Sequence, residues 1–394
     1  MDKCKKRNYG IDLLRIVSMF MVVVLHVLGQ GGILNITLGL TLKGEIAWFI
    51  EIACYCAVNC YALISGYVAY NSERKLRTFI SLWLQVFFYC FIFNAIELVL
   101  MYQQGTIASL SISQLLKTIL RMFLPILTNQ YWYFTAYAGL FLIIPLLNVV
   151  IEHTPRKTLR DVLIILSLLI YAGERLFSAF ALGFRDGYSF PWLALVYVIG
   201  GYIAKYNPFE KISCGKAFFY YGLCVIATFV ARIVVELTIY LIKGQVVKGG
   251  YESLIIAYTT PTILLSAMFL VHGFSNMKIG GKFSKVISFF APLSFGVYLI
   301  HTSPFIFAKL TNKFIAFIDY NFIVMLGLVL TTSLAIFAIC IAIDFIRKLL
   351  FSLCHAKQFS AWMEKNFKKL YSKFANKTYD VKETQDLIVE SEKE

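Results

Sequence analysis

The chain has 394 residues, of which 59% are hydrophobic and only 15% are charged, and its net charge is +15. Its mean hydropathy of +0.72 excludes an ordinary soluble domain, because a soluble core could not cover so much apolar surface. The positive charge does not indicate a nucleic-acid-binding protein, since the sequence contains no soluble basic face that could hold a phosphate backbone. Composition therefore predicts a membrane protein.

Apolar stretches long enough to cross the hydrocarbon of a bilayer recur from residue 11 to residue 350. They predict about ten transmembrane helices, near residues 12–30, 46–70, 78–102, 131–151, 159–181, 188–204, 216–242, 254–274, 286–308 and 321–346. The expected fold is an all-α polytopic membrane protein, with residues 1–350 as one membrane-embedded domain. Residues 111–127 are shorter and carry two basic side chains, which is typical of an amphipathic helix at the surface.

The two ends of the chain are predicted to lie in the cytoplasm. Basic residues precede the first span, and with the N-terminus inside, most Lys and Arg fall on inner segments. Much of the net charge is then explained by topology and by contact with anionic lipid. Residues 351–394 are expected to form a charged cytoplasmic tail, in which a surface helix leads into a disordered segment rich in Lys and Glu.

One histidine interrupts the first apolar run, "IVSMFMVVVLHVLGQ". This residue, His26, follows Arg15 by eleven positions, and eleven helical steps return to nearly the same face about 16 Å higher. We expect Arg15 at the cytoplasmic mouth of a groove and His26 near the middle of the membrane. The simpler alternative is that His26 bonds to a neighbouring helix while Arg15 anchors the span at the inner surface.

Charged residues also lie near the ends of other spans, on the side predicted to be outside. They are Glu51, Glu97, Glu174, Arg175, Arg232 and Glu236. Arg232 and Glu236 are one helical turn apart and can pair, but six charges on one side favour a polar cavity that opens outward. Trp132 and Tyr137 start a span on the same side, where they fit either an aromatic belt or a surface that stacks on sugars.

Four segments together resemble the acyltransferase-3 family of integral membrane acyltransferases. They are "GIDLLRIVSMFMVVVLH", "LISGYVAYNSERKLRTF", "QYWYFTAYAGLFLIIPLLN" and "LSFGVYLIHTSPF", and they occur in the family's order over residues 8 to 350. The resemblance implies transfer of an acyl group, most often acetyl from acetyl-CoA, to a hydroxyl of a carbohydrate or a similar cell-envelope acceptor. Some relatives carry an additional extracytoplasmic domain, so we expect this chain either to act alone or to act with separate envelope-biosynthesis proteins as partners.

The residues fit this chemistry without the family name. Acyl transfer to a hydroxyl needs a base, and we assign this role to His26, with His301 as a second proton-handling or orienting group. The acetyl-CoA phosphates are assigned to Arg15, Arg74, Lys75 and Arg77. Arginine suits bidentate phosphate contact, although inside-positive topology explains the same loop equally well. The acceptor is assigned to Glu51, Trp132, Tyr137, Glu174, Arg175, Arg232 and Glu236.

The sequence thus predicts an O-acyltransferase of the cell membrane that moves an acetyl group from cytoplasmic acetyl-CoA to a cell-envelope carbohydrate or its lipid-linked precursor. No metal is expected, because no cysteine pair has the spacing of zinc ligands. One alternative is a secondary transporter that uses the intramembrane His, Glu and Arg side chains as a proton or ion relay. A non-catalytic assembly partner is the other alternative.

Overall fold

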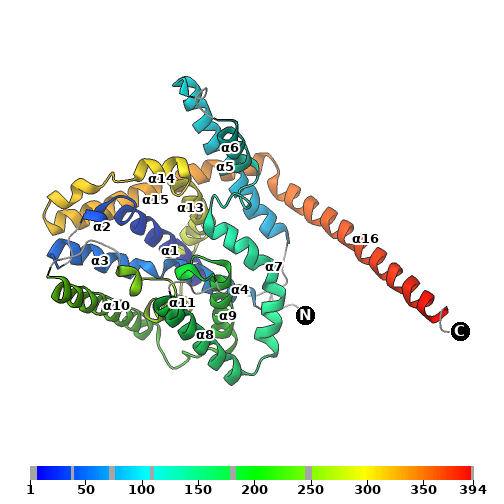
Figure 1. Cartoon of the computed structure of the whole chain (residues 1–394), viewed down its shortest axis with the longest axis horizontal. Coiled ribbons are helices and arrows are strands. Elements are labelled where there is room, and N and C mark those ends of the chain that lie inside the picture. The colour runs from blue at the N-terminus through cyan, green and yellow to red at the C-terminus, as the bar shows by residue number, and fades with distance from the viewer. Residues whose placement is uncertain are drawn as a thin grey trace.

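A computed structural model describes residues 7–36, 40–70, 76–106, 111–177, 183–244 and 251–391 of the chain. Within these ranges the only regular secondary structure is helical, and there is no strand, so the predicted all-α class is confirmed. Figure 1 shows the helices gathered side by side into one bundle, from which the C-terminal helix projects.

Seven helical segments of the described chain are long and apolar enough to cross a membrane. They are α1 (Tyr9–Leu28), α3 with α4 (Leu42–Tyr55 and Ala57–Ala69), α5 (Leu76–Gln103), α7 (Trp132–His153), α10 (Cys214–Lys243), α12 with α13 (Gly281–Phe290 and Ser294–His301) and α15 (Phe322–Leu353). Each coincides with a span predicted from the sequence, which confirms a multi-pass membrane protein.

The other three predicted spans also coincide with helices, which are shorter or more polar. They are α8 (Arg156–Leu176), α9 (Phe190–Tyr206) and α11 (Pro261–Ser275). The remaining helices are α2 (Ile33–Ile36), α6 (Ile112–Phe123), α14 (Pro304–Leu310) and α16 (Ala356–Ser391). The span predicted at 254–274 begins too early, because residues 255–260 before α11 are irregular. The span predicted at 286–308 ends too late, because α13 stops at His301.

Helix α1 runs through the middle of the bundle and contacts α3, α4, α11, α13 and α15. It begins at Asn8, whose side chain accepts hydrogen bonds from the backbone N–H groups of Gly10 and Ile11. A Cβ placed on Gly10 would lie 1.8 Å from the carbonyl oxygen of Phe274, so only glycine allows α1 and α11 to approach this closely. The central position of α1 brings its side chains within reach of several other helices.

The predicted ninth span is broken in the structure. Pro292 lies in the turn Ala291–Leu293 between α12 and α13, and proline cannot donate the backbone hydrogen bond that would continue the helix. Helix α13 then packs on α15, where a Cβ on Gly296 would lie 2.0 Å from the Asp344 carboxylate carbon. The Asp344 carboxylate is itself held by Arg347 and by the hydroxyl of Tyr89. This buried cluster fixes the short helix that carries His301.

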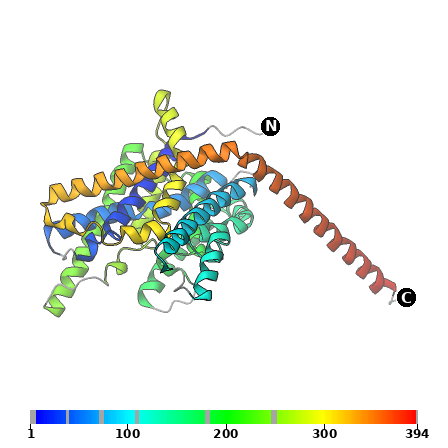
Figure 2. The same cartoon turned by 90° about the horizontal axis from the view of Figure 1, so that it is seen from above.

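Two helices lie at the edges of the bundle. Helix α6 begins at Ser111 with a reciprocal capping box and packs on α5, which agrees with the predicted amphipathic helix over 111–127. Helix α16 follows α15 after a short break and leaves the bundle, as Figures 1 and 2 show. The surface helix predicted at the start of the tail is present, and α16 extends to Ser391.

Candidate functional site

The two histidines selected from the sequence meet inside the bundle. His26 Nδ1 lies 2.9 Å from His301 Nε2, although 275 positions separate the two residues in the chain. His26 is on the last turn of α1, and His301 is the last residue of α13 and is 1% exposed. The edge of the Phe307 ring packs against the His26 imidazole with 5.0 Å between centroids. The contact therefore depends on the packing of three segments.

The hydrogen bonds of His301 determine which nitrogen carries each proton when both rings are neutral. His301 Nδ1 is 2.5 Å from the carbonyl oxygen of Val297, and a carbonyl oxygen can only accept, so Nδ1 donates. His301 Nε2 is then an acceptor, and His26 Nδ1–H must donate to it. His26 consequently carries its lone pair on Nε2. This is the arrangement of a general base that is oriented by a second group.

His26 lines a small cavity of about 90 Å³ whose wall is mostly aromatic. The aromatic lining residues are Tyr61, Trp132, Tyr133, Tyr188, Tyr258, Phe295 and Tyr298. The remaining lining residues, from α1 and α4, are aliphatic or Met. Apart from His26 and the phenols, the lining of this cavity contains no titratable group, so the imidazole is the base nearest to anything bound there.

Arg15 lines a second and larger cavity of about 570 Å³. The first turns of α1 and the segment before the helix build its polar end, where the Asp12 carboxylate binds both Arg7 Nε and Arg15 Nη1 at 2.5 Å. Asp12 is buried, whereas the Arg7 and Arg15 side chains are 48% and 32% exposed. One carboxylate therefore holds two guanidinium groups at the edge of the cavity and leaves a net positive charge there.

The two cavities share part of their walls. Tyr61, Tyr133 and Phe295 line both of them. Tyr61 also donates a hydrogen bond from its hydroxyl to the backbone carbonyl of Arg15 at 2.6 Å, which fixes α4 against α1 at this level. Arg15 and His26, which were predicted to face one groove, line two adjacent cavities that have these three aromatic side chains in common.

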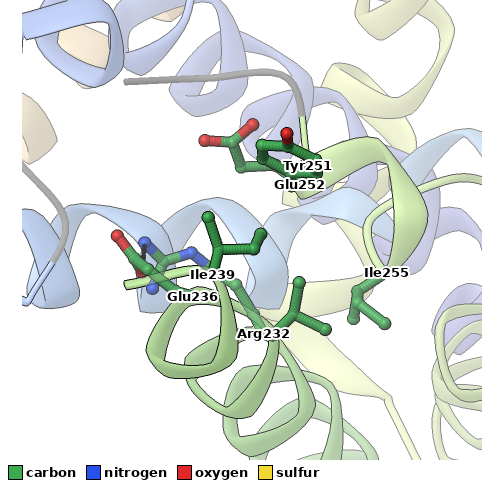
Figure 3. A pocket seen from close by; sticks show the side chains of 7 residues that line it. Arg232, Glu236, Ile239, Tyr251, Glu252 and Ile255 are labelled. Carbon is green, nitrogen blue, oxygen red and sulfur yellow. Dashed lines mark ion pairs between the residues drawn. The ribbon is translucent and has the colours of Figure 1, made fainter. Parts of the chain in front are cut away.

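Four of the six outer charges predicted to line one polar cavity lie in two separate ion clusters, to which Glu51 and Glu97 do not belong. Arg232 donates to Glu45 at 2.7 Å and pairs with Glu236 at 2.6 Å, which confirms the predicted pairing within α10. Figure 3 shows this pair at the edge of a small pocket, with Tyr251 and Glu252 on a separate segment across from it. The Arg232 guanidinium also lies over the Trp48 ring, 4.9 Å from its centroid. These contacts join α10 to α3.

Glu174 and Arg175, at the end of α8, belong to the second cluster. Arg175 pairs with the Asp186 carboxylate, and Glu174 accepts a hydrogen bond from the Asp186 backbone N–H at 2.8 Å. Glu174 also accepts from the Thr259 hydroxyl at 2.9 Å. The cluster thus holds two loops together, and Glu174 and Arg175 are not among the residues that line the two cavities.

Two of the other predicted site residues line a cavity. Trp132 lines the His26 cavity, whereas Tyr137 lines the cavity of Arg15. Glu51 is buried in α3. Arg77 is exposed on the first turn of α5, next to Thr78, which lines the Arg15 cavity. Arg74 and Lys75, which were assigned to phosphate binding, lie outside the described residues.

Comparison with known families matches residues 8–346 to a family model described as an acyltransferase domain. This match covers most of the chain. The chain therefore belongs to the acyltransferase-3 family. No significant match was found among curated proteins or solved structures. The family membership makes the protein a membrane acyltransferase, and the resemblance noted in the four sequence segments is confirmed.

Sequence reasoning missed several residues that line the two cavities. Arg7 was counted only as a topology signal, and Asp12 was not considered, although its position three residues before Arg15 on one helix permits pairing. Tyr188 and Tyr258 come from loops whose positions no local pattern predicts. Their contribution to the His26 cavity depends on contacts between segments that are distant in the chain.

Proposed function

We propose that this membrane acyltransferase is an O-acetyltransferase that uses acetyl-CoA as donor and a hydroxyl of a cell-envelope carbohydrate, or of its lipid-linked precursor, as acceptor. The observation that carries the proposal is the pair of adjacent cavities. One has two guanidinium groups at its edge, and the other has an oriented imidazole on an aromatic wall. An anionic donor and an uncharged hydroxylated acceptor fit these two environments.

The donor is assigned to the larger cavity. CoA carries several phosphate charges, and arginine binds phosphate through paired N–H donors. Arg7 and Arg15, which Asp12 holds side by side, supply such donors, and Arg77 is exposed near the same cavity. The pantetheine arm would then extend past Tyr61 and Tyr133 so that the thioester reaches His26. These shared wall residues would have to turn aside to admit the thiol end.

The acyl transfer is assigned to His26. Its Nε2 takes the proton from the acceptor hydroxyl while the oxygen attacks the thioester carbonyl, forming the C–O bond of the ester. Collapse of the tetrahedral intermediate breaks the C–S bond, and the imidazolium returns the proton to the departing CoA thiolate. His301 Nε2 accepts the Nδ1–H hydrogen bond of His26 throughout, so it orients the ring and stabilises the positive charge that forms on it.

The test measures the donor reaction directly. Purified protein in detergent is incubated with acetyl-CoA and a panel of methyl glycosides, and release of the CoA thiol is followed together with the mass of the glycosides. We expect thiol release and an acetylated glycoside. Mass spectrometry of envelope glycans from cells with and without the protein then identifies the natural acceptor. Absence of acetyl-CoA binding, together with passage of a solute across vesicles, would replace the proposal with the transporter alternative.

The proposal also requires the donor cavity to face the cytoplasm. Single cysteines at Arg156 and Lys211 lie on segments that the charge count assigns to the inner side, so an impermeant thiol reagent outside intact cells should not label them in a background without accessible native cysteines. A cysteine at Lys248, which lies outside the described residues, should be labelled. The reverse pattern would exchange the donor and acceptor sides.

A further inference from the structure

Two loops on one side of the bundle supply aromatic residues to the His26 cavity. The loop at 183–189 carries Tyr188, and the segment at 251–260 carries Tyr258. The centroids of these two rings are 4.7 Å apart, and Tyr188 lies 4.8 Å from Trp132 of α7. Tyr188 is 40% exposed whereas Tyr258 is 5% exposed. The loops therefore form a wall of the cavity that is buried at Tyr258 and partly exposed at Tyr188.

Glu174 joins these two loops. Its Oε1 accepts from the Asp186 N–H of the first loop, and its Oε2 accepts from the Thr259 hydroxyl of the second. The side chain of Glu174 is only 8% exposed, so water cannot readily replace either bond. A single carboxylate at the end of α8 thus fixes the positions of the residues next to Tyr188 and Tyr258.

Backbone contacts also join the two loops. Tyr258 donates from its N–H to the Asp186 carbonyl at 3.1 Å, and the Tyr258 carbonyl accepts from the buried side chain of Asn59 at 2.9 Å. Gly187 has a φ of +94°, and a Cβ there would lie 2.5 Å from the Tyr258 Cβ. The two loops are therefore packed at backbone distance, and Glu174 is the side chain that both of them contact.

We propose that Glu174 is a positioning residue for the acceptor side of the reaction: it holds Tyr188 and Tyr258 against Trp132, so that the acceptor meets a preformed aromatic wall beside His26. The inference rests on the proposed function. It changes the role of Glu174 from a ligand of the acceptor to an anchor of the residues that contact the acceptor. Preformed geometry matters here because a loosely held wall must be ordered each time the acceptor binds.

The test uses the full chain in detergent and begins with hydrogen–deuterium exchange. Glu174→Ala should increase amide exchange in both loops, whereas Thr259→Val should increase it mainly in residues 251–260. Glu174→Gln keeps a carbonyl oxygen for the Asp186 N–H and an amide that can bond to the Thr259 hydroxyl, so its exchange should stay near wild type. Asp161→Ala removes a half-exposed carboxylate from the other end of α8 and is the matched control.

Kinetics then separate positioning from general folding. Glu174→Ala should raise the KM for methyl glycosides about tenfold, with acetyl-CoA hydrolysis in the absence of glycoside within about twofold of wild type. Glu174→Gln should restore most of the KM. Unchanged exchange in both loops, or a parallel fall in hydrolysis and transfer, would overturn the inference. Absence of acetyl-CoA turnover in the wild type would instead overturn the proposed function, and the exchange experiment would still show whether Glu174 anchors the two loops.

Discussion

The two cavities of this acyltransferase differ in how they can act on a substrate. The larger one presents Arg7 and Arg15, which are partly exposed and are held by a buried carboxylate. The smaller one presents one imidazole, which a fully buried histidine orients among aromatic rings. Exposed charge attracts an anion but is screened by salt, whereas a hydrogen bond between two neutral rings, one of them buried, aligns a base and is insensitive to salt. Binding and chemistry are thus assigned to different physical environments.

The largest expected effect concerns the base. His26→Ala should lower acyl transfer by about 10²- to 10⁴-fold, the usual contribution of a positioned general base, and should leave acetyl-CoA affinity almost unchanged. CoA thiol release by purified protein measures the first quantity, and equilibrium binding measures the second. His153→Ala, an exposed histidine at the end of α7, is the matched control. Turnover near the wild-type rate in folded His26→Ala would remove His26 from the mechanism.

The next effect concerns the donor cavity, where a substitution should lower the affinity for acetyl-CoA more than it lowers turnover. Arg15→Ala should weaken acetyl-CoA binding about tenfold to a hundredfold, because a charge-assisted phosphate contact contributes about 1.5 to 3 kcal/mol. The bound donor should still react, so kcat changes less than affinity. Arg160→Ala removes an exposed, paired arginine from α8 and serves as control. Equal affinities in Arg15→Ala and wild type would reduce Arg15 to a topology signal.

Local periodicity accounts for the parts of this molecule that the sequence predicts well. Apolar length is a property of a single segment, so all ten predicted spans coincide with helices. The Arg232–Glu236 pair likewise follows from a four-residue spacing within one helix. The break at Pro292 also has a local cause, although the apolar residues around it predict an uninterrupted span.

The rest of the site depends on contacts between distant segments. Nothing near His26 in the sequence identifies His301 as its partner, because the contact is made by packing α1 against α13. The same holds for the outer charges. Glu174 and Arg232 were predicted to line one cavity because both lie near the same side of the membrane. In the structure, each is paired with residues of different loops and helices. Predicting depth is therefore not sufficient to predict which charges share a site.

A smaller effect sharpens the assignment within the histidine pair. His301→Ala removes the acceptor of the His26 Nδ1–H bond, and one such bond contributes about 0.5 to 1.5 kcal/mol, so turnover should fall about twofold to tenfold with little change in acetyl-CoA affinity. His301→Gln offers a carbonyl oxygen at the same position and should recover part of the loss. A larger fall in His301→Ala than in His26→Ala would mean that the two roles must be exchanged.

The smallest expected effect tests the physical difference between the cavities most directly, because it needs no substitution. Raising the ionic strength shortens the range over which exposed charges act. The affinity of the protein for acetyl-CoA should then fall about twofold to fivefold, because Arg7 and Arg15 are partly exposed. This is the range expected when exposed ion pairs contribute up to about 1 kcal/mol. Turnover at saturating acetyl-CoA should not change, since His26 is oriented by a hydrogen bond to His301, which is buried. In Arg15→Ala the salt dependence of binding should be weaker than in wild type. If salt instead lowers turnover at saturation and leaves affinity constant, charge acts in the chemical step, and the separation of binding from chemistry between the two cavities is wrong.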